Sequence, residues 1–249
     1  MIDLSFIQLF LSALIILSAS LIKGITGFGF ALLAVPFLSL IFPMQVLVPA
    51  MSLFNLLTSL VILFKMKERI KAYYFIPMFV ASLGGIPLGI YALEYISSDI
   101  LRLITGILIV IFSLRMLGKV RLAKRLRRYP IFFAGFISGI LTSSISVGGP
   151  PLVLAMNRKG YKKEMFRGVF AWFSTFSSFF TTAAFVMKGM MEPLSINLAL
   201  VCLPLLFLGS HWGSRISTKI QPDKFRKIVI GINIITGAFI VVTSLINHH

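Results

Sequence analysis

Residues 23–36 read KGITGFGFALLAVP and interrupt an otherwise hydrophobic part of the chain. An apolar run at 4–22 leads into them, and a shorter apolar run at 28–42 follows. A membrane-spanning helix needs about 20 apolar residues, so the first run is long enough to cross a bilayer. Three glycines lie within six positions of this stretch, and glycine lets the backbone turn. The stretch therefore predicts a membrane helix that is broken near its end.

The rest of the chain repeats this pattern of long hydrophobic runs. Hydrophobic residues make up 58% of the chain, and charged residues only 12%, which is about half the share in a soluble domain. We therefore expect an all-α polytopic membrane protein with about 8–10 transmembrane segments, some of them short or broken. The further runs lie at 46–64, 73–96, 100–117, 131–147, 168–187, 197–214 and 228–246.

Basic residues gather in the segments between these runs and give the chain a net charge of +17. A basic excess also occurs in nucleic-acid-binding proteins, but such a protein does not need the apolar runs, so we expect no nucleic-acid partner. Basic loops stay in the cytoplasm during membrane insertion. The clusters at 65–71, 119–128, 158–167 and 215–227 therefore predict ten crossings, with both termini outside.

An internal repeat divides the chain into two halves. We expect a membrane repeat at 1–118, a basic cytoplasmic linker at 119–128 and a second membrane repeat at 129–249. Five crossings in each half is an odd number, which predicts that the halves are inverted. Chance similarity between apolar helices is the alternative. The matching pairs are Gly85 with Gly209, Gly89 with Gly213, Asp99 with Asp223 and Arg102 with Arg226 at an offset of 124, and Gly24 with Gly139 and Pro36 with Pro151 at 115. An aspartate in this position also suits a helix N-cap.

A second break, SSISVGGPP at 143–151, lies in the second half. Inverted repeats with broken helices are a transporter design, in which substrate binds near the midplane between the half-helix ends. A helix that begins after such a break presents free N–H groups and its positive dipole end. Two facing helix starts would bind an anion, although close helix packing also explains the glycines. The expected substrate-binding residues at the breaks are Gly24, Thr26, Gly27, Phe28, Gly29, Pro36, Ser144, Ser146, Gly148, Gly149 and Pro150.

Polar residues within or beside the runs complete this candidate site. Asn55 lies in the middle of a run, and Ser174 follows it by 119 residues in the second half. A polar side chain in the membrane needs a partner, so both residues either line the path or join helices. Lys23 either attracts the anion or extends to the cytoplasmic interface. His211 is a candidate for proton coupling, because histidine titrates near neutral pH, and packing is its alternative role.

Two motifs resemble the signatures of a known family of permeases. Residues 23–36 resemble the first signature of the sulfite exporter TauE/SafE family, and GFISG at 135–139, continuing to Gly148, Gly149 and Pro150, resembles the second. The second motif has SSIS where the family commonly has glycines. The resemblance covers essentially the whole chain. It implies transport of small anions such as sulfite, organosulfonates or related organic acids across the bacterial inner membrane, without a cofactor.

Other functions remain as alternatives at this stage. A drug or metabolite exporter can share a five-plus-five inverted design, and an anion channel has the same composition. A membrane-embedded enzyme needs a nucleophile, a metal cluster or paired acids, and the runs contain no such group. We expect no metal site, since Cys202 is the single cysteine. His248 and His249 are assigned no function.

Overall fold

The structure is a computed structural model that describes residues 6–66, 70–117, 131–158, 161, 163–216, 230–231 and 234–243. The described residues form α-helices and one short 3₁₀ turn, which confirms the expected all-α fold. The elements are α1 (Phe6–Thr26), α2 (Phe30–Leu38), α3 (Met44–Lys65), η1 (Ala72–Tyr74), α4 (Ile76–Tyr95), α5 (Ser98–Leu117), α6 (Ile131–Ile145), α7 (Gly149–Arg158), α8 (Lys163–Met187), α9 (Pro193–Ile216) and a final helix Ile234–Thr243.

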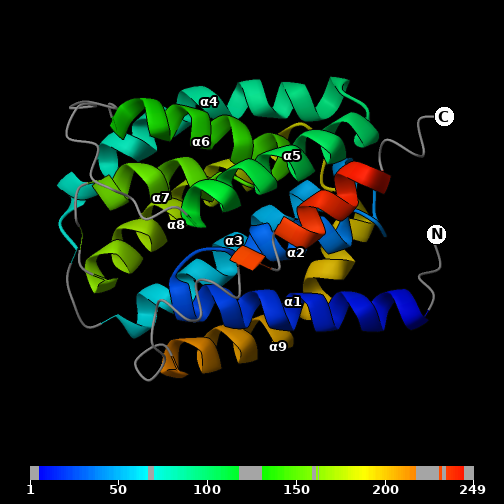
Figure 1. Cartoon of the computed structure of the whole chain (residues 1–249), viewed down its shortest axis with the longest axis horizontal. Coiled ribbons are helices and arrows are strands. Elements are labelled where there is room, and N and C mark those ends of the chain that lie inside the picture. Colours follow the sequence, from blue (N-terminus) through cyan, green and yellow to red (C-terminus); the bar gives the residue numbers. More distant parts are fainter. Residues whose placement is uncertain are drawn as a thin grey trace.

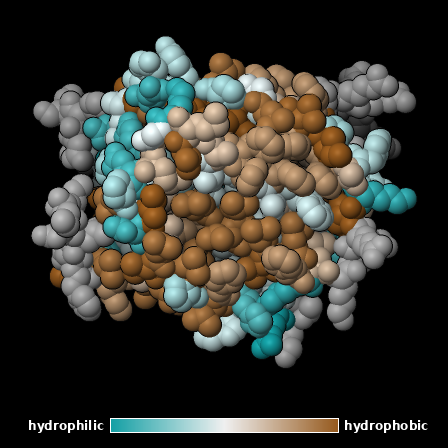
Figure 2. All heavy atoms as spheres, turned by 180° about the vertical axis from the view of Figure 1, so that it is seen from behind, coloured by the Kyte–Doolittle hydropathy of each residue, from teal (hydrophilic) through white to brown (hydrophobic). Residues whose placement is uncertain are grey.

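The exterior of the helix bundle matches a lipid environment. Five helices, α1, α3, α4, α8 and α9, are long and apolar enough to cross a membrane. Large apolar side chains such as Leu88, Leu200 and Phe207 are exposed on the outside of the bundle. Figure 2 shows hydrophobic side chains over the middle of the visible face and hydrophilic ones gathered toward its ends. A contiguous apolar surface of this extent needs lipid around it, so the chain is a multi-pass membrane protein.

Two of the runs are broken, one in each half of the chain. Residues 27–29 separate α1 from α2, and residues 146–148 separate α6 from α7. Both breaks begin later than we predicted, because α1 continues through Gly24 to Thr26 and α6 continues through Ser143 to Ile145. The Ser143 hydroxyl donates to the carbonyl of Gly139 on its own helix (2.9 Å), a bond that is compatible with a helical backbone.

Closely packed helix pairs hold the bundle together. The most extensive contacts join α4 to α6 and α1 to α9. A Cβ added at Gly85 of α4 would collide with the carbonyl oxygen of Phe136 on α6. A Cβ added at Gly209 of α9 would lie 2.7 Å from the carbonyl oxygen of Leu17 on α1. These glycines allow two backbones to approach as closely as in small-residue helix interfaces of membranes.

The helix ends gather at two opposite ends of the molecule. Helix α1 begins, and the helix Ile234–Thr243 ends, at the same end of the molecule, while α7 and α9 end at the opposite one (Figure 1). The prediction that both termini lie outside the cell stays a prediction. The predicted linker 119–128 and the residues Asp223, Arg226, His248 and His249 lie outside the described residues.

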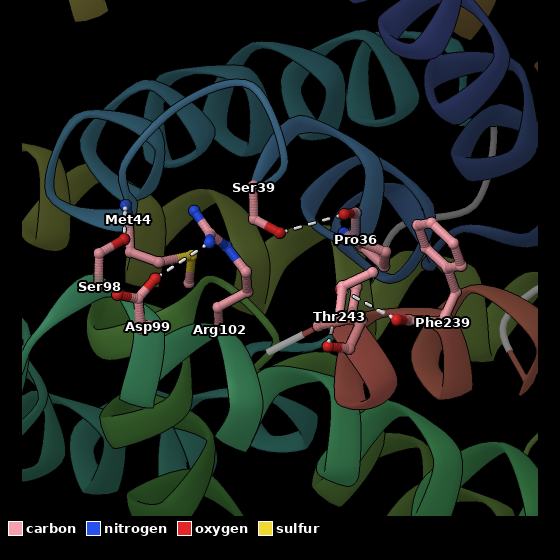
Figure 3. A network of polar contacts seen from close by, with 9 residues as sticks. Pro36, Ser39, Met44, Ser98, Asp99, Arg102, Phe239 and Thr243 are labelled. Atoms are coloured by element: carbon pink, nitrogen blue, oxygen red, sulfur yellow. Dashed lines mark hydrogen bonds and ion pairs between the residues drawn. The ribbon is translucent and has the colours of Figure 1, made fainter. Parts of the chain in front are cut away.

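A polar network joins the beginnings of α3 and α5 (Figure 3). The backbone N–H of Met44 donates to the hydroxyl of Ser98 (2.9 Å), so the start of α5 satisfies a free donor of α3. Asp99 lies in the first turn of α5 and forms an ion pair with Arg102 (3.1 Å). The Asp99 carboxylate therefore pairs with this arginine, and no backbone cap involving Asp99 is seen within the described part of the chain.

Candidate functional site

Both helix breaks border one cavity in the interior of the bundle. The cavity has a volume of about 40 Å³, measured as the space that the centre of a water molecule can reach. A water molecule needs roughly 10–15 Å³ on this measure, so the cavity holds an object about as large as a few waters. Its lining consists of Lys23, Phe28, Gly29, Phe30, Ala31, Leu32, Asn55, Thr142, Ser146, Val147, Gly148, Gly149, Pro150, Phe170, Phe173, Ser174, Ser177 and Ser178.

The start of α2 is shaped by the residues of the first break. Gly29 has φ 94°, a left-handed conformation that glycine adopts without strain, and no side chain caps the helix that follows. The Thr26 hydroxyl lies 2.9 Å from the carbonyl of Ile22 and accepts the N–H of Phe28 at 3.2 Å. Gly29, Phe30 and Ala31 line the cavity, so the start of α2, where the free N–H groups and the positive dipole end of a helix lie, borders it.

The start of α7 offers fewer hydrogen-bond donors than the start of α2. Ser146 takes the positive φ of this break (59°), and the Ser138 hydroxyl donates to the carbonyl of Gly148. Pro150 and Pro151 stand in the first turn and have no N–H. The backbone donors at this end are therefore limited to the glycines, although the helix dipole is still directed at the cavity.

Lys23 brings an amino group, which is cationic when protonated, to this cavity. Its side chain is 1% exposed, and its ammonium group donates to both the backbone and the side-chain oxygen of Asn55, each at 3.0 Å. The Phe30 ring centroid lies 5.9 Å from the same nitrogen. The alternative that Lys23 extends to the cytoplasmic interface is wrong, because Asn55 and Phe30 hold it inside. This arrangement also supplies the partner that Asn55 needs within the membrane.

The ammonium of Lys23 still has capacity for a further ligand. An ammonium group has three donor hydrogens, and the oxygens of Asn55 accept two of them. No carboxylate among the described residues forms an ion pair with Lys23. The protonated amine would be an unpaired buried charge, which is unfavourable in a protein interior, and an anion in the cavity would compensate it.

The cavity lining is also rich in hydroxyl groups. Ser174 accepts a hydrogen bond from Ser59 on α3 (2.9 Å), so α3 and α8 are joined beside the cavity. The Ser177 side chain is 1% exposed, and its hydroxyl has no hydrogen-bond partner among the described residues. Thr142 and Ser178 add two further hydroxyls. Such groups donate hydrogen bonds to an oxygen-rich anion without adding charge.

Two of the expected binding residues pack against neighbouring helices. Gly24 is buried against α9, where an added Cβ would lie 2.9 Å from Cα of Gly213, and its carbonyl accepts a hydrogen bond from Arg167 (2.9 Å). Gly27 has φ 85° and lies against the Arg167 side chain. Gly24 thus allows close helix packing, and Gly27 allows a turn that Thr26 also supports.

Three further expected residues also lie outside the cavity lining. Pro36 is buried inside α2, and the Ser144 hydroxyl donates to the carbonyl of Ile140 on its own helix (2.7 Å). His211 lies on α9, where its carbonyl accepts a hydrogen bond from Lys65 (3.1 Å). Proton coupling through His211 remains a prediction, but this histidine does not contact the cavity. The binding roles of the nine expected residues in the lining are likewise still predictions.

Of the aromatic residues in the wall only Phe28 was expected from the sequence, and one buried arginine was also missed. Phe30, Phe170 and Phe173 line the cavity, and Phe28 packs edge-on against Phe166 with a centroid distance of 5.7 Å. The spacing of Phe170, Phe173, Ser174 and Ser177 places them on one face of α8, and this periodicity was a usable signal. Nothing in the sequence separated Arg167 from the basic segment 158–167.

Titratable metal ligands do not cluster in the described part of the chain. No group of three or more His, Cys, Asp or Glu side chains is found there that could hold a metal ion. The lining residues with hydrogen-bonding side chains are Lys23, Asn55 and the hydroxyl residues, which are ligands for an oxoanion.

Comparison with known proteins gives two matches. A family model described as Sulfite exporter TauE/SafE matches residues 12–240. A protein of Cupriavidus necator, named a probable sulfite/organosulfonate exporter TauE, is 26% identical over 172 residues, which are 66% of this chain and 67% of that protein. No solved structure matches the chain.

Proposed function

The chain belongs to the sulfite exporter TauE/SafE family, and from this premise we propose that it is a secondary transporter that exports a small sulfur oxoanion, sulfite or an organosulfonate, across the bacterial inner membrane. The protein is not an enzyme in this proposal, and it needs no cofactor. The name of the Cupriavidus necator relative supports this class of substrate.

The observation that carries the proposal is the buried ammonium of Lys23 between two helix starts. An oxoanion in the cavity would accept the remaining hydrogen of Lys23 together with N–H groups at the start of α2 and hydroxyls of α8. The interaction would occur away from bulk water, where charges attract each other more strongly. The small volume of the cavity favours an anion with few non-hydrogen atoms.

We propose that substrate crosses by alternating access between two inverted repeats. Cavity-lining residues support this repeat because they pair at one offset: Gly148 follows Gly29 by 119 residues, as Thr142 follows Lys23 and Ser174 follows Asn55. The starts of α3 and α8 differ by the same number. The offset of 115 taken from Gly24 and Gly139 differs from it by about one helical turn.

The packing of the helices supports the same proposal. Under the repeat, α1 corresponds to α6 and α4 to α9, so the contact of α4 with α6 corresponds to that of α9 with α1. These are the two most extensive helix contacts in the described structure. The basic ends of α7 and α9 favour a cytoplasmic location for that end of the molecule.

The test is transport by the purified full-length chain in proteoliposomes. We expect saturable uptake of labelled sulfite, counterflow against internal sulfite, and competition by sulfonates but not by cations. A panel of sulfite, sulfonates and carboxylates, with and without a pH gradient, identifies the substrate class and any proton coupling. Flux that rises linearly with concentration and shows no counterflow would indicate a channel, and an absence of anion flux would refute the proposal.

A further inference from the structure

One face of α8 carries hydroxyl side chains beyond the cavity. Phe170, Phe173, Ser174, Ser177 and Ser178 line the cavity at helical spacing. The next residue on this face is Thr181, which is fully buried. It follows Ser177 by four residues, so the two side chains are neighbours on the helix surface, with about 5–6 Å between their Cβ atoms.

The hydroxyls of Ser177 and Thr181 lack partners, a property that they share with Thr175 and Ser210 among the described residues. Neither hydroxyl has a hydrogen-bond partner among the described residues. Other buried hydroxyls bind the carbonyl four residues earlier, as Ser20 does with Ile16 (2.7 Å) and Thr105 with Leu101 (2.7 Å). This local bond is the ordinary solution for Ser and Thr in membrane helices, because an unsatisfied polar group in the bilayer core costs several kcal/mol.

The neighbouring threonine provides an internal comparison. Thr182 lies on an adjacent face of α8, and its hydroxyl forms a hydrogen bond with Ser52 of α3 (2.8 Å). Joining helices is therefore the role of Thr182. Thr181 has no such partner in the described structure, so helix association does not explain why a hydroxyl is buried there.

From this arrangement we infer that α8 carries a second oxoanion-binding position, formed by the hydroxyls of Ser177 and Thr181, on the side of the cavity toward Met187. This inference rests on the proposed anion transport. Thr181 lies seven residues beyond Ser174, which is roughly 10 Å along the helix axis. Phe185, four residues further on, is completely buried and ends the hydroxyl face. An oxoanion leaving Lys23 would thus accept hydrogen bonds from uncharged groups at this position.

The experiment measures stability and transport in the same variants. Thr181→Val preserves the side-chain shape and removes the unpartnered hydroxyl, so we expect the melting temperature in detergent to stay level or rise by about 2–4 °C. Sulfite-induced thermal stabilisation, which reports the central cavity, is expected to be unchanged. The initial rate of sulfite transport is expected to fall about three- to tenfold, the equivalent of one neutral hydrogen bond. Thr181→Ser, which retains a hydroxyl, should restore most of the rate.

The matched control is Thr105→Val on α5, which removes a buried hydroxyl that binds its own helix. It should leave the transport rate unchanged. Wild-type transport by Thr181→Val would overturn the inference, and so would a loss of rate that follows a loss of stability, since that result indicates a structural hydroxyl. If the wild-type chain transports no anion, the proposed function itself fails. An active wild type with an equally active Thr181→Val refutes the second position alone.

Discussion

Replacing Lys23 with methionine separates an anion site from a packing role for this residue. The substitution keeps an unbranched side chain of similar length and removes the ammonium that donates to Asn55. A hydrogen bond to a charged group contributes about 1.5–3 kcal/mol. Because 1.4 kcal/mol corresponds to a tenfold change in affinity, the lost contact predicts sulfite binding that is about 10- to 150-fold weaker.

The stability of Lys23→Met is not expected to fall together with its affinity for sulfite. Removing a buried charge relieves a desolvation cost of several kcal/mol, while the freed side-chain oxygen of Asn55 costs about 1–3 kcal/mol. We therefore expect Lys23→Met to fold with a stability equal to or above that of the wild type. A lysine that served only packing would show the opposite pattern, with normal sulfite binding and a lowered melting temperature.

The assay is sulfite binding to the purified protein, measured by the sulfite-induced shift of the melting temperature and by counterflow in proteoliposomes. The matched control is Lys65→Met, which removes an exposed lysine at the end of α3 that binds the carbonyl of His211. This control should bind sulfite within about twofold of the wild type, since an exposed charge is screened by salt. Binding by Lys23→Met within the same twofold range would refute the reasoning.

Two further predictions concern helix packing and Asn55. Gly85→Ala should lower the melting temperature strongly, because its Cβ would collide with the carbonyl oxygen of Phe136. Gly84→Ala should be nearly neutral, because its Cβ would lie 3.6 Å from the Phe136 ring. Equal effects of the two variants in thermal unfolding would contradict this prediction. Asn55→Leu should reduce sulfite transport and stability more than Thr58→Val does. It removes the side-chain oxygen that accepts from buried Lys23 and leaves only the backbone oxygen of residue 55 as acceptor, whereas the Thr58 hydroxyl binds its own helix at Phe54 (2.6 Å). Equal losses of transport rate would indicate that Asn55 only joins helices.

The broken membrane helices could be predicted because their signals are local. Apolar runs of about 20 residues predict membrane helices. Clusters of glycine and proline within or beside such runs predict breaks in these helices. The exact ends of α1 and α6 could not be predicted. Gly24 is helical because it packs against α9, and the Ser143 hydroxyl bonds to its own helix. Gly24 contacts α9 with its backbone, and a sequence alone does not reveal which helix lies opposite a glycine.

The composition of the cavity was only partly predictable for a related reason. Gly29, Asn55 and Gly149 were expected at the site because a polar or flexible residue inside an apolar run is conspicuous. Phe30 and Phe170 were not expected, because an aromatic side chain facing a cavity looks the same in sequence as one facing lipid. Two alternatives remained open for Lys23, because a lysine at the end of an apolar run usually extends to water. Only the position of Asn55 in the folded chain shows that Lys23 is held inside.

A substitution at Gly149 tests whether the space between the two helix starts is used. Gly149 begins α7 with no positive φ, and a Cβ placed there meets only the tip of the Phe170 ring at 3.4 Å. Gly149→Ala should therefore fold and keep most of its transport. Gly149→Leu should also insert and fold, but its isobutyl group would occupy a cavity of only about 40 Å³ and cover the N–H groups of α7, so sulfite flux should be lost.

Gly29→Leu at the first break is a less direct test of the same space. Gly29 has φ 94°, so any side chain there adds backbone strain of about 1–2 kcal/mol, and a loss of flux can then come from a loss of stability. Gly149 carries no such strain, and its alanine variant provides the control for folding. Normal sulfite flux through well-folded Gly149→Leu would mean that the anion does not pass between α2 and α7, because a leucine there leaves no room for it beside the ammonium of Lys23.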